Sequence, residues 1–209
     1  MNRLLVALTA IITFSCINAA NAQFYVGAHA GANFVQDSDL EDPLESDAQA
    51  SADTGFVVNG VAGYRFGVDD GLSLDLEGEI TYRQNGLDDV ELAGSAFDAS
   101  GDVSSFAFLV NAWLNWEIAD SGFAPYFGGG IGAIRVSIDD PEVAGISLGD
   151  DESDTVLGGQ IGAGIGYSVT DNVVVSLDYR FLITDDPEFG DTEAEYQNHS
   201  VMLGFKYLF

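Results

Sequence analysis

The sequence predicts an all-β protein, an eight-stranded antiparallel up-and-down transmembrane β-barrel. Three observations lead to this prediction. Apolar and polar residues alternate with a period of two in eight segments, long and short connections between these segments alternate, and aromatic residues gather near the segment ends. Successive side chains of a β-strand point to opposite faces, so each segment reads as a strand with one apolar and one polar face.

The segment 72–83 shows the alternation most clearly, because its even positions are apolar or glycine and its odd positions are polar. A tilted strand needs about 9–11 residues to cross a bilayer. The segment 123–136 is less regular, since Ile134 and Val136 fall on the face opposite Phe127 and Ile131. A β-bulge at 128–130 or at Gly132 would reconcile them, and its register stays open. The eight expected strands are 24–34, 56–66, 72–83, 106–118, 123–136, 157–169, 173–183 and 201–209.

The connections distinguish a membrane barrel from a soluble β-sandwich, which would also bury an apolar face. Turns at 69–71, 120–122 and 171–172 alternate with long connections at 35–54, 85–102, 137–155 and 185–197. Outer-membrane barrels have short periplasmic turns, long external loops and aromatic girdles at both interfaces. The expected periplasmic girdle contains Phe24, Tyr64, Phe66, Trp116, Tyr167, Tyr207 and Phe209, and the outer girdle contains Phe34, Phe56, Tyr82, Phe106 and Phe181.

Residues 1–22 are expected to be a cleaved secretory signal peptide, and 23–209 a single barrel domain. Arg3 provides the positive start, an apolar run follows, and Ala20 and Ala22 fit the small-residue cleavage pattern. The one cysteine, Cys16, lies within this segment and has poor lipoprotein-type surroundings, so we expect a mature chain without disulfides.

The sequence resembles the eight-stranded OmpA-type barrels, within the wider group of opacity proteins and surface antigens. The resemblance lies in the segments 24–28 and 125–132 and in the last strand, which ends at Phe209. It implies an outer membrane location in a Gram-negative bacterium, with both termini in the periplasm. It also implies that the terminal Phe205, Tyr207 and Phe209 form the signal that the barrel-assembly machinery reads.

The polar faces predict a charged lumen, which an eight-stranded barrel leaves just wide enough for side chains to fill. Charges in such an interior need partners, so we expect an ion-paired plug, and a narrow ion path is the alternative. The expected network is Arg65, Asp75, Glu77, Glu79, Arg83, Glu117, Asp178, Arg180 and Lys206.

The formal net charge of −28 is concentrated in the four long connections, which hold 25 of the 34 acidic residues and no Lys or Arg. This charge excludes a nucleic-acid partner. It is typical of solvated loops, and it also favours weak binding of hard divalent cations without an EF-hand spacing. The candidate Ca²⁺ ligands are Asp37, Asp39, Glu41, Asp150, Asp151 and Asp154.

The functional prediction is a structural and surface-interaction protein rather than an enzyme, with no cofactor beyond loosely bound divalent cations. Its expected partners are outer membrane lipid, lipopolysaccharide and a host or environmental surface. A small ion or solute pore is the first alternative and a lipid-modifying enzyme the second. His199 and Ser200 are similar to the His and Ser of lipid A deacylases, but adjacent strand residues point to opposite faces.

Overall fold

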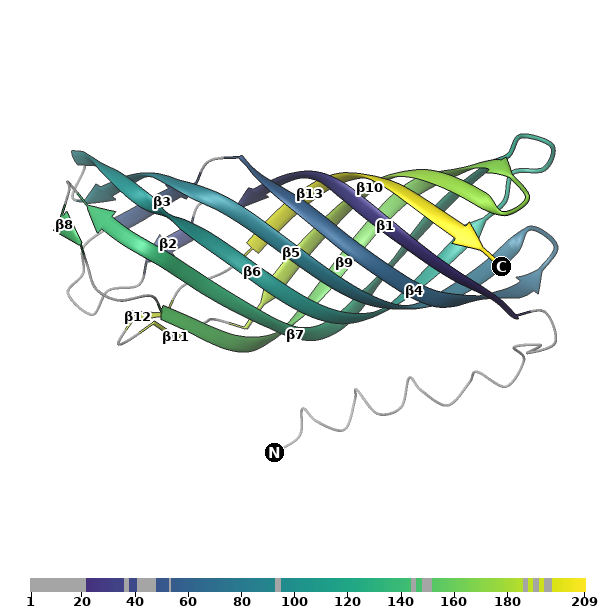
Figure 1. The fold of residues 1–209 in the computed structure, drawn as a ribbon, viewed down its shortest axis with the longest axis horizontal. Helices are drawn as coiled ribbons and strands as arrows, with labels where there is room; N and C mark the ends of the chain where they lie inside the picture. Colours follow the sequence, from purple (N-terminus) through teal and green to yellow (C-terminus); the bar gives the residue numbers. More distant parts are fainter. Residues whose placement is uncertain are drawn as a thin grey trace, which may run out of the picture.

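Eight long antiparallel strands form the body of the protein in the computed structural model (Figure 1). The structure describes residues 22–35, 38–40, 48–52, 54–92, 95–143, 146–147, 152–185, 188–189, 192–193 and 197–209. The long strands are β1 (Ala22–Val35), β4 (Gly55–Asp69), β5 (Leu72–Leu92), β6 (Ser95–Trp116), β7 (Phe123–Val143), β9 (Glu152–Thr170), β10 (Val173–Thr184) and β13 (Gln197–Leu208). The short strands are β2 (Ser38–Leu40), β3 (Ala48–Ala52), β8 (Ile146–Ser147), β11 (Glu188–Phe189) and β12 (Thr192–Glu193).

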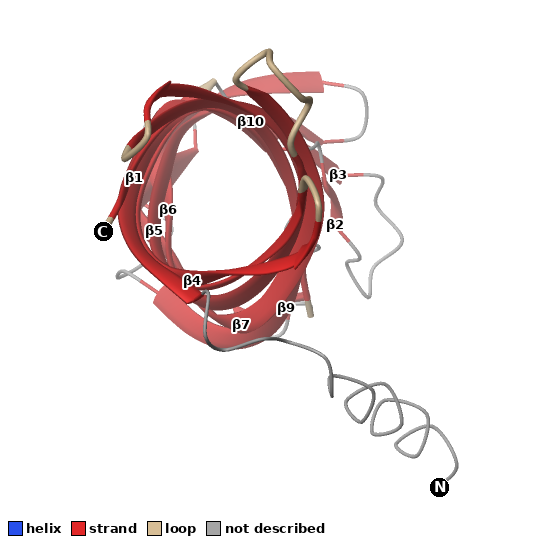
Figure 2. Cartoon of the chain, turned by 90° about the vertical axis from the view of Figure 1, so that its right-hand side faces the viewer, coloured by secondary structure: helices blue, strands red, loops and turns tan. Residues whose placement is uncertain are grey.

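The first and last long strands pair with each other, and this pairing closes the barrel. β1 and β13 are antiparallel from Tyr25 opposite Leu208 to Val35 opposite Asn198. Every other long strand pairs with its neighbours in the chain, in an up-and-down order. Figure 2 looks along the resulting ring of strands. The predicted fold class is therefore confirmed. Within the described residues, no helix is both long enough and apolar enough to span a membrane.

Three tight turns join the strands at the end of the barrel that also holds Ala22 and Phe209 (Figure 1). Gly71 and Gly122 adopt positive φ angles of 80° and 75°, and Asp120 has a φ of 58°. Glycine enters this region without steric cost, and Asp tolerates it better than most residues. These turns coincide with the predicted short connections 69–71, 120–122 and 171–172.

Several strands extend beyond the bounds that the sequence predicted. β5, β6 and β7 contain 21, 22 and 21 residues, about twice the length needed to cross a bilayer. The predicted long connection 85–102 is mostly a paired hairpin, because β5 and β6 remain paired up to Leu92 opposite Ser95, with one shift of register between Gly86 and Asp89. β3 adds to the same hairpin by pairing with residues 87–92 of β5. The extra length of these strands lies at the end of the barrel opposite the termini.

The two faces of the strands separate apolar from polar side chains as the alternation predicted. The outer face carries exposed Val110, Ile131, Leu157 and Leu203, each at least 67% accessible. Aromatic rings pack against each other near both ends of this face, for example Phe24 with Tyr64 and Phe56 with Tyr82. A surface of this kind is stable only in contact with lipid.

Strand β7 differs from the prediction of a bulge. Its pairing with β6 and β9 is regular over 126–138, so Ile134 and Val136 point into the barrel, where they are 0% and 1% exposed. They pack there with Ala107, Leu109 and Leu182. The bulge was expected because apolar residues were assigned only to the lipid face. The lumen accepts them because neighbouring strands supply apolar partners at the same level.

A close approach of β1 to β13 provides a test of the closure. A Cβ atom added to Gly31 would lie 1.9 Å from the carbonyl oxygen of Val201, whereas one added to Gly60 would meet nothing within 4 Å. We expect Gly31→Ala to destabilise the folded barrel by roughly 1–3 kcal/mol, as overpacking does. Gly60→Ala, the matched control, should leave stability nearly unchanged.

The measurement is the urea midpoint at which the fast-migrating folded band, seen on gels without boiling, is lost. Equal midpoints for Gly31→Ala and Gly60→Ala would contradict the described pairing of β1 with β13. Wild-type protein that migrates identically before and after boiling would contradict the closed barrel itself.

Candidate functional site in the barrel lumen

The inner faces of the strands bring together a set of buried charged and amide side chains. Strand alternation positions them, because Asp75, Glu77 and Glu79 occupy successive inward positions of β5. Each of these three carboxylates is at most 3% exposed. Removing ionised groups from water costs several kcal/mol per ion unless partners compensate. The contacts of each carboxylate therefore decide what the lumen can do.

Glu79 has the largest number of partners among the three. Arg180 of β10 forms an ion pair with its Oε2 atom. Asn111 and Gln160 donate to the same oxygen over 2.7 and 3.0 Å, and Thr81 donates its hydroxyl hydrogen to Oε1. Charge-assisted hydrogen bonds are stronger than neutral ones. Glu79 therefore links β5, β6, β9 and β10 across the lumen.

Glu77 lies one inward position closer to the termini and joins a second group. Trp113 donates its indole N–H to Oε1 over 3.1 Å, and Tyr25 donates its hydroxyl to Oε2 over 3.0 Å. Lys206 of β13 lies 3.3 Å from Oε2. The same ammonium lies 4.9 Å from the ring centroid of Tyr25, a cation–π contact. Aromatic rings thus occupy the space between the charges.

Asp75 completes the β5 series at the periplasmic end. Arg65 of β4 binds it through two parallel hydrogen bonds of 2.8 and 2.9 Å. Lys206 lies 3.9 Å from the same carboxylate. A bidentate pair of this kind combines charge with fixed geometry. It joins β4 to β5 across the part of the lumen nearest the termini.

Asp178 forms the centre of the opposite wall, on β10. Tyr126 and Ser176 donate hydroxyl hydrogens to its two oxygens, the second over 2.7 Å. Arg180 lies 3.6 Å away, and His29 Nε2 lies 3.9 Å away. Arg180 thus bridges Asp178 and Glu79, and its guanidinium also stacks 4.9 Å above the ring of Trp113.

Two further members of the predicted network are Glu117 and Arg83. Glu117 follows the end of β6, is exposed, and lines a cavity of about 220 Å³ together with Arg65, so it lies at the mouth of the barrel rather than deep in the lumen. The strand ends at Trp116 because the chain turns there, and the backbone N–H of Glu117 bonds to Gly71. Arg83 is buried, at 1% exposure, two residues beyond Thr81 on β5.

The outer half of the lumen is polar on one side and apolar on the other. Asn33 donates to Asn85 and Asn198 over 2.6 and 2.7 Å, and Ser200 donates to Asn33 over 2.8 Å. The apolar side is formed by the cluster around Ile134 and Val136. Apart from Arg83, which is level with Val136, the charges named above lie in the central part of the lumen and in the part nearest the termini.

Sequence reasoning did not include Trp113, Tyr126 or Arg135 in any site. Trp113 shares its parity with the inward Asn111 and Asn115, so the alternation itself could have found it. Tyr126 and Arg135 lie on β7, whose register the sequence left open. Inward Gly128 faces Trp113, where an added Cβ would lie 2.9 Å from the Trp113 ring atom Cε3. The glycines of β7 therefore make room for large residues opposite.

The two catalytic candidates, His199 and Ser200, are not brought together. His199 packs on the outer surface against Tyr179 and Phe181, whereas Ser200 lies inside, at 1% exposure. Of the proposed calcium ligands, the structure describes the side chain of Asp154, which accepts the backbone N–H of Thr155. Asp37, Glu41, Asp150 and Asp151 lie outside the described residues, as does the side chain of Asp39. Within the described part of the chain, no group of three or more His, Cys, Asp or Glu residues is placed to hold a metal.

The residues of the predicted assembly signal alternate on the outer face of β13. Phe205, Tyr207 and Phe209 are exposed, and Phe209 packs against Phe24 and Tyr207. The backbone N–H of Phe209 bonds to the carbonyl oxygen of Phe24 over 2.9 Å. The predicted signal peptide lies outside the described residues except for Ala22, the first residue of β1.

The family model of the outer membrane protein beta-barrel domain matches residues 5–209. The chain belongs to this family. Outer membrane protein PagN of Salmonella typhimurium is 23% identical to it, over 95% of each protein. The barrel matches Neisserial surface protein A with a TM-score of 0.59 and 20% identity, over 90% of this chain and 99% of the other. It also matches the outer membrane protease OmpT of Escherichia coli, with a TM-score of 0.53 and 10% identity, over 90% and 97%. The protein is thus an outer membrane barrel of a Gram-negative bacterium.

Arg180 provides a test of the charge network. Arg180→Gln leaves Glu79 and Asp178 without their shared cation, and unpaired buried charges are strongly destabilising. We expect a loss of about 3–5 kcal/mol in the free energy of unfolding, measured by urea titration in detergent. Adding Glu79→Gln to this variant should recover part of the loss, because one uncompensated charge is then removed.

A double variant that is as unstable as the sum of the two single variants would contradict direct coupling between Arg180 and Glu79. Asp185→Asn, which changes an exposed carboxylate, serves as the control and should alter stability by less than about 0.5 kcal/mol.

Proposed function

We propose that this barrel is a non-enzymatic surface-interaction protein whose lumen is closed by ion pairs and whose acidic outer segments meet the environment. The observation that carries the proposal is the placement of charge. The connections at the end opposite the termini hold 25 of the 34 acidic residues and no Lys or Arg. The described basic residues, apart from Arg135, point into the barrel. Net charge of one sign on an exposed surface selects partners of the opposite sign.

The contacts in the lumen support a plug rather than a pore. Arg65 and Lys206 connect Asp75 and Glu77 into one chain of ion pairs, and Arg180 connects Glu79 and Asp178 into a second. Asn111 joins the two chains by donating to both Glu77 and Glu79. The rings of Tyr25, Trp113 and Tyr126 lie among them. An eight-stranded barrel is just wide enough for side chains to fill. An ion that enters would have to break several of these pairs at once.

The placement of the histidines supports a non-enzymatic role. A general base must lie within hydrogen-bond reach of the group that it activates. His199 faces away from Ser200, and His29 is enclosed in the lumen, hydrogen-bonded to Asn59 over 2.7 Å. OmpT is a protease with a similar barrel, but a likeness of the fold does not carry an active site with it.

The acidic segments suggest two classes of partner. Clustered carboxylates bind hard divalent cations weakly, and such cations would connect Asp37, Asp39, Glu41, Asp150, Asp151 and Asp154 to the phosphates of lipopolysaccharide beside the barrel. The same charge attracts basic patches on host or environmental surfaces. Phe205, Tyr207 and Phe209 remain the proposed signal for the barrel-assembly machinery, and residues 1–22 the proposed export signal.

The plug is tested by conductance in planar bilayers. We expect wild-type protein to give no steady open events, because the ion pairs at Asp75 and Glu79 close the lumen at two levels. Steady events whose conductance shifts in Arg83→Ala or Arg180→Ala would instead establish the pore. Before each measurement, the protein is shown to be folded by the change of its gel mobility on heating.

The surface role is tested by retention of expressing cells on amine-coated beads at low salt. Replacing Asp and Glu by Asn and Gln in 36–53 and 139–154, at constant length, should lower retention several-fold. At about 1 M salt the difference should vanish, because the Debye length falls to about 3 Å. Equal retention by wild-type and neutralised cells at low salt would refute the charge-based role. Unchanged lipid A mass in the same cells excludes the deacylase alternative.

A further inference from the structure

Arg135 differs from every other basic residue that the structure describes. Its side chain is exposed on the outer surface of the barrel, whereas Arg83, Arg180 and Lys206 are buried inside and Arg65 is held by Asp75. The orientation follows from the regular register of β7, because Ile134 and Val136 on either side point inward. One of the five guanidinium N–H donors goes to the Ser153 hydroxyl over 2.9 Å. A single cation therefore faces outward from a chain of net charge −28.

The height of Arg135 on the barrel coincides with the outer edge of the apolar band. It lies opposite Phe106 of β6 and Thr155 of β9. On the same outer face, the next residue pair toward the termini is Ala133 with Leu157, and Leu157 is 67% exposed. In the opposite direction along β7, the next residue on this face is Ser137. The guanidinium is thus located where hydrocarbon gives way to lipid headgroups.

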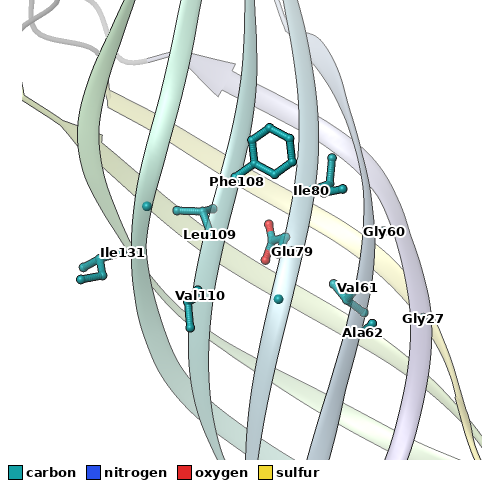
Figure 3. A pocket seen from close by; sticks show the side chains of 12 residues that line it. Gly27, Gly60, Val61, Ala62, Glu79, Ile80, Phe108, Leu109, Val110 and Ile131 are labelled. Carbon is teal, nitrogen blue, oxygen red and sulfur yellow. The ribbon is translucent and has the colours of Figure 1, made fainter. Parts of the chain in front are cut away.

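An apolar groove lies nearby on the same face, and its lining residue Leu157 is one outward-facing position from Thr155, the residue opposite Arg135. It has a volume of about 720 Å³ and extends over β6, β7, β9 and β10, with Val110, Ile131, Leu157 and Ile183 projecting around Gly159. A second hollow of about 620 Å³ adjoins it across Val110 and Ile131. Figure 3 shows this second hollow, where Gly60 and Ala62 lie beside Ile80, Phe108 and Val110.

We propose that Arg135 and the groove around Gly159 form a specific site for a phosphorylated, acylated glycolipid of the outer leaflet, that is, for lipopolysaccharide. The guanidinium binds a phosphate oxygen pair in its planar fork, and one acyl chain fills the groove below. Charge complementarity selects an anionic occupant, since Arg135 is the one Lys or Arg side chain on the described outer surface. The groove is continuous with the lipid-facing surface, so an acyl chain reaches it without displacing protein.

The carboxylate of Asp185 limits where the phosphate can lie. Asp185 lines the groove and directly follows Thr184, the last residue of β10. β9 separates β10 from β7, so the two strands are about 10 Å apart at a spacing of roughly 4.8 Å per strand. The phosphate therefore binds on the β7 side, and the groove accommodates the chain between the two charges. This site goes beyond the proposed function, because it lies in the membrane wall and not in the acidic outer segments.

The test measures lipid binding to the full barrel, purified in detergent, by native mass spectrometry. The probe is lipid A with both phosphates, compared with fully dephosphorylated lipid A of the same acylation. We expect the phosphorylated form to bind about tenfold more tightly. Arg135→Gln should abolish this preference, and Arg135→Lys should keep most of it. A preference that persists in Arg135→Gln would overturn the proposal.

The groove is tested by filling it. A Cβ added at Gly159 makes its nearest contact at 3.5 Å, so Gly159→Leu places a side chain in the groove without backbone strain. We expect it to weaken lipid A binding several-fold, whereas Gly60→Leu, the matched control in the second hollow, should not. Equal effects of the two variants would refute the groove. Inorganic phosphate that competes at the same concentration as lipid A would show that the site binds a free anion instead. Retention on amine-coated beads is measured separately, so failure of this site leaves the surface role intact.

Discussion

Hydrocarbon offers no hydrogen-bond partners, so each backbone N–H and C=O that crosses a membrane must be satisfied within the protein. A sheet meets this requirement only if it has no edges. The pairing of β1 with β13 removes the last two edges. It requires Gly31 to approach Val201 so closely that no side chain fits between them. Closure of the ring thus limits which residues can lie where β1 pairs with β13.

Closure also determines what happens to the polar side chains. A ring of eight strands has an inner surface too small for bulk water, so Glu77, Glu79 and Asp178 must find partners within it. The partners come from strands far apart in the chain, as when Arg180 binds Glu79. Aromatic rings then fill the remaining space. The same geometry that makes the outside apolar therefore makes the inside a cross-linked core.

The sequence predicted the ring and the inward charges because a period of two is a local property of each strand. It could not predict which charges meet, since the contact between Lys206 and Glu77 depends on registers accumulated around the whole ring. The inward position of Ile134 was missed because a lumen residue can be apolar wherever neighbouring strands supply apolar side chains at the same level. Glu117 was assigned inward because the alternation continues past the end of β6. The 85–102 hairpin was read as a loop because its sequence contains several Gly, Ser and acidic residues and no sustained alternation of apolar and polar residues.

The location of the basic residues in the barrel strands affects how the protein resists proteases outside the cell. Proteases that cleave after Lys or Arg need an accessible, locally unfolded bond. From Ala22 onward the chain contains Arg65, Arg83, Arg135, Arg180 and Lys206, and each lies within a paired strand. The long connections 35–54, 85–102, 137–155 and 185–197 contain no such residue. These connections therefore offer no cleavage site to trypsin-like proteases, whatever their conformation.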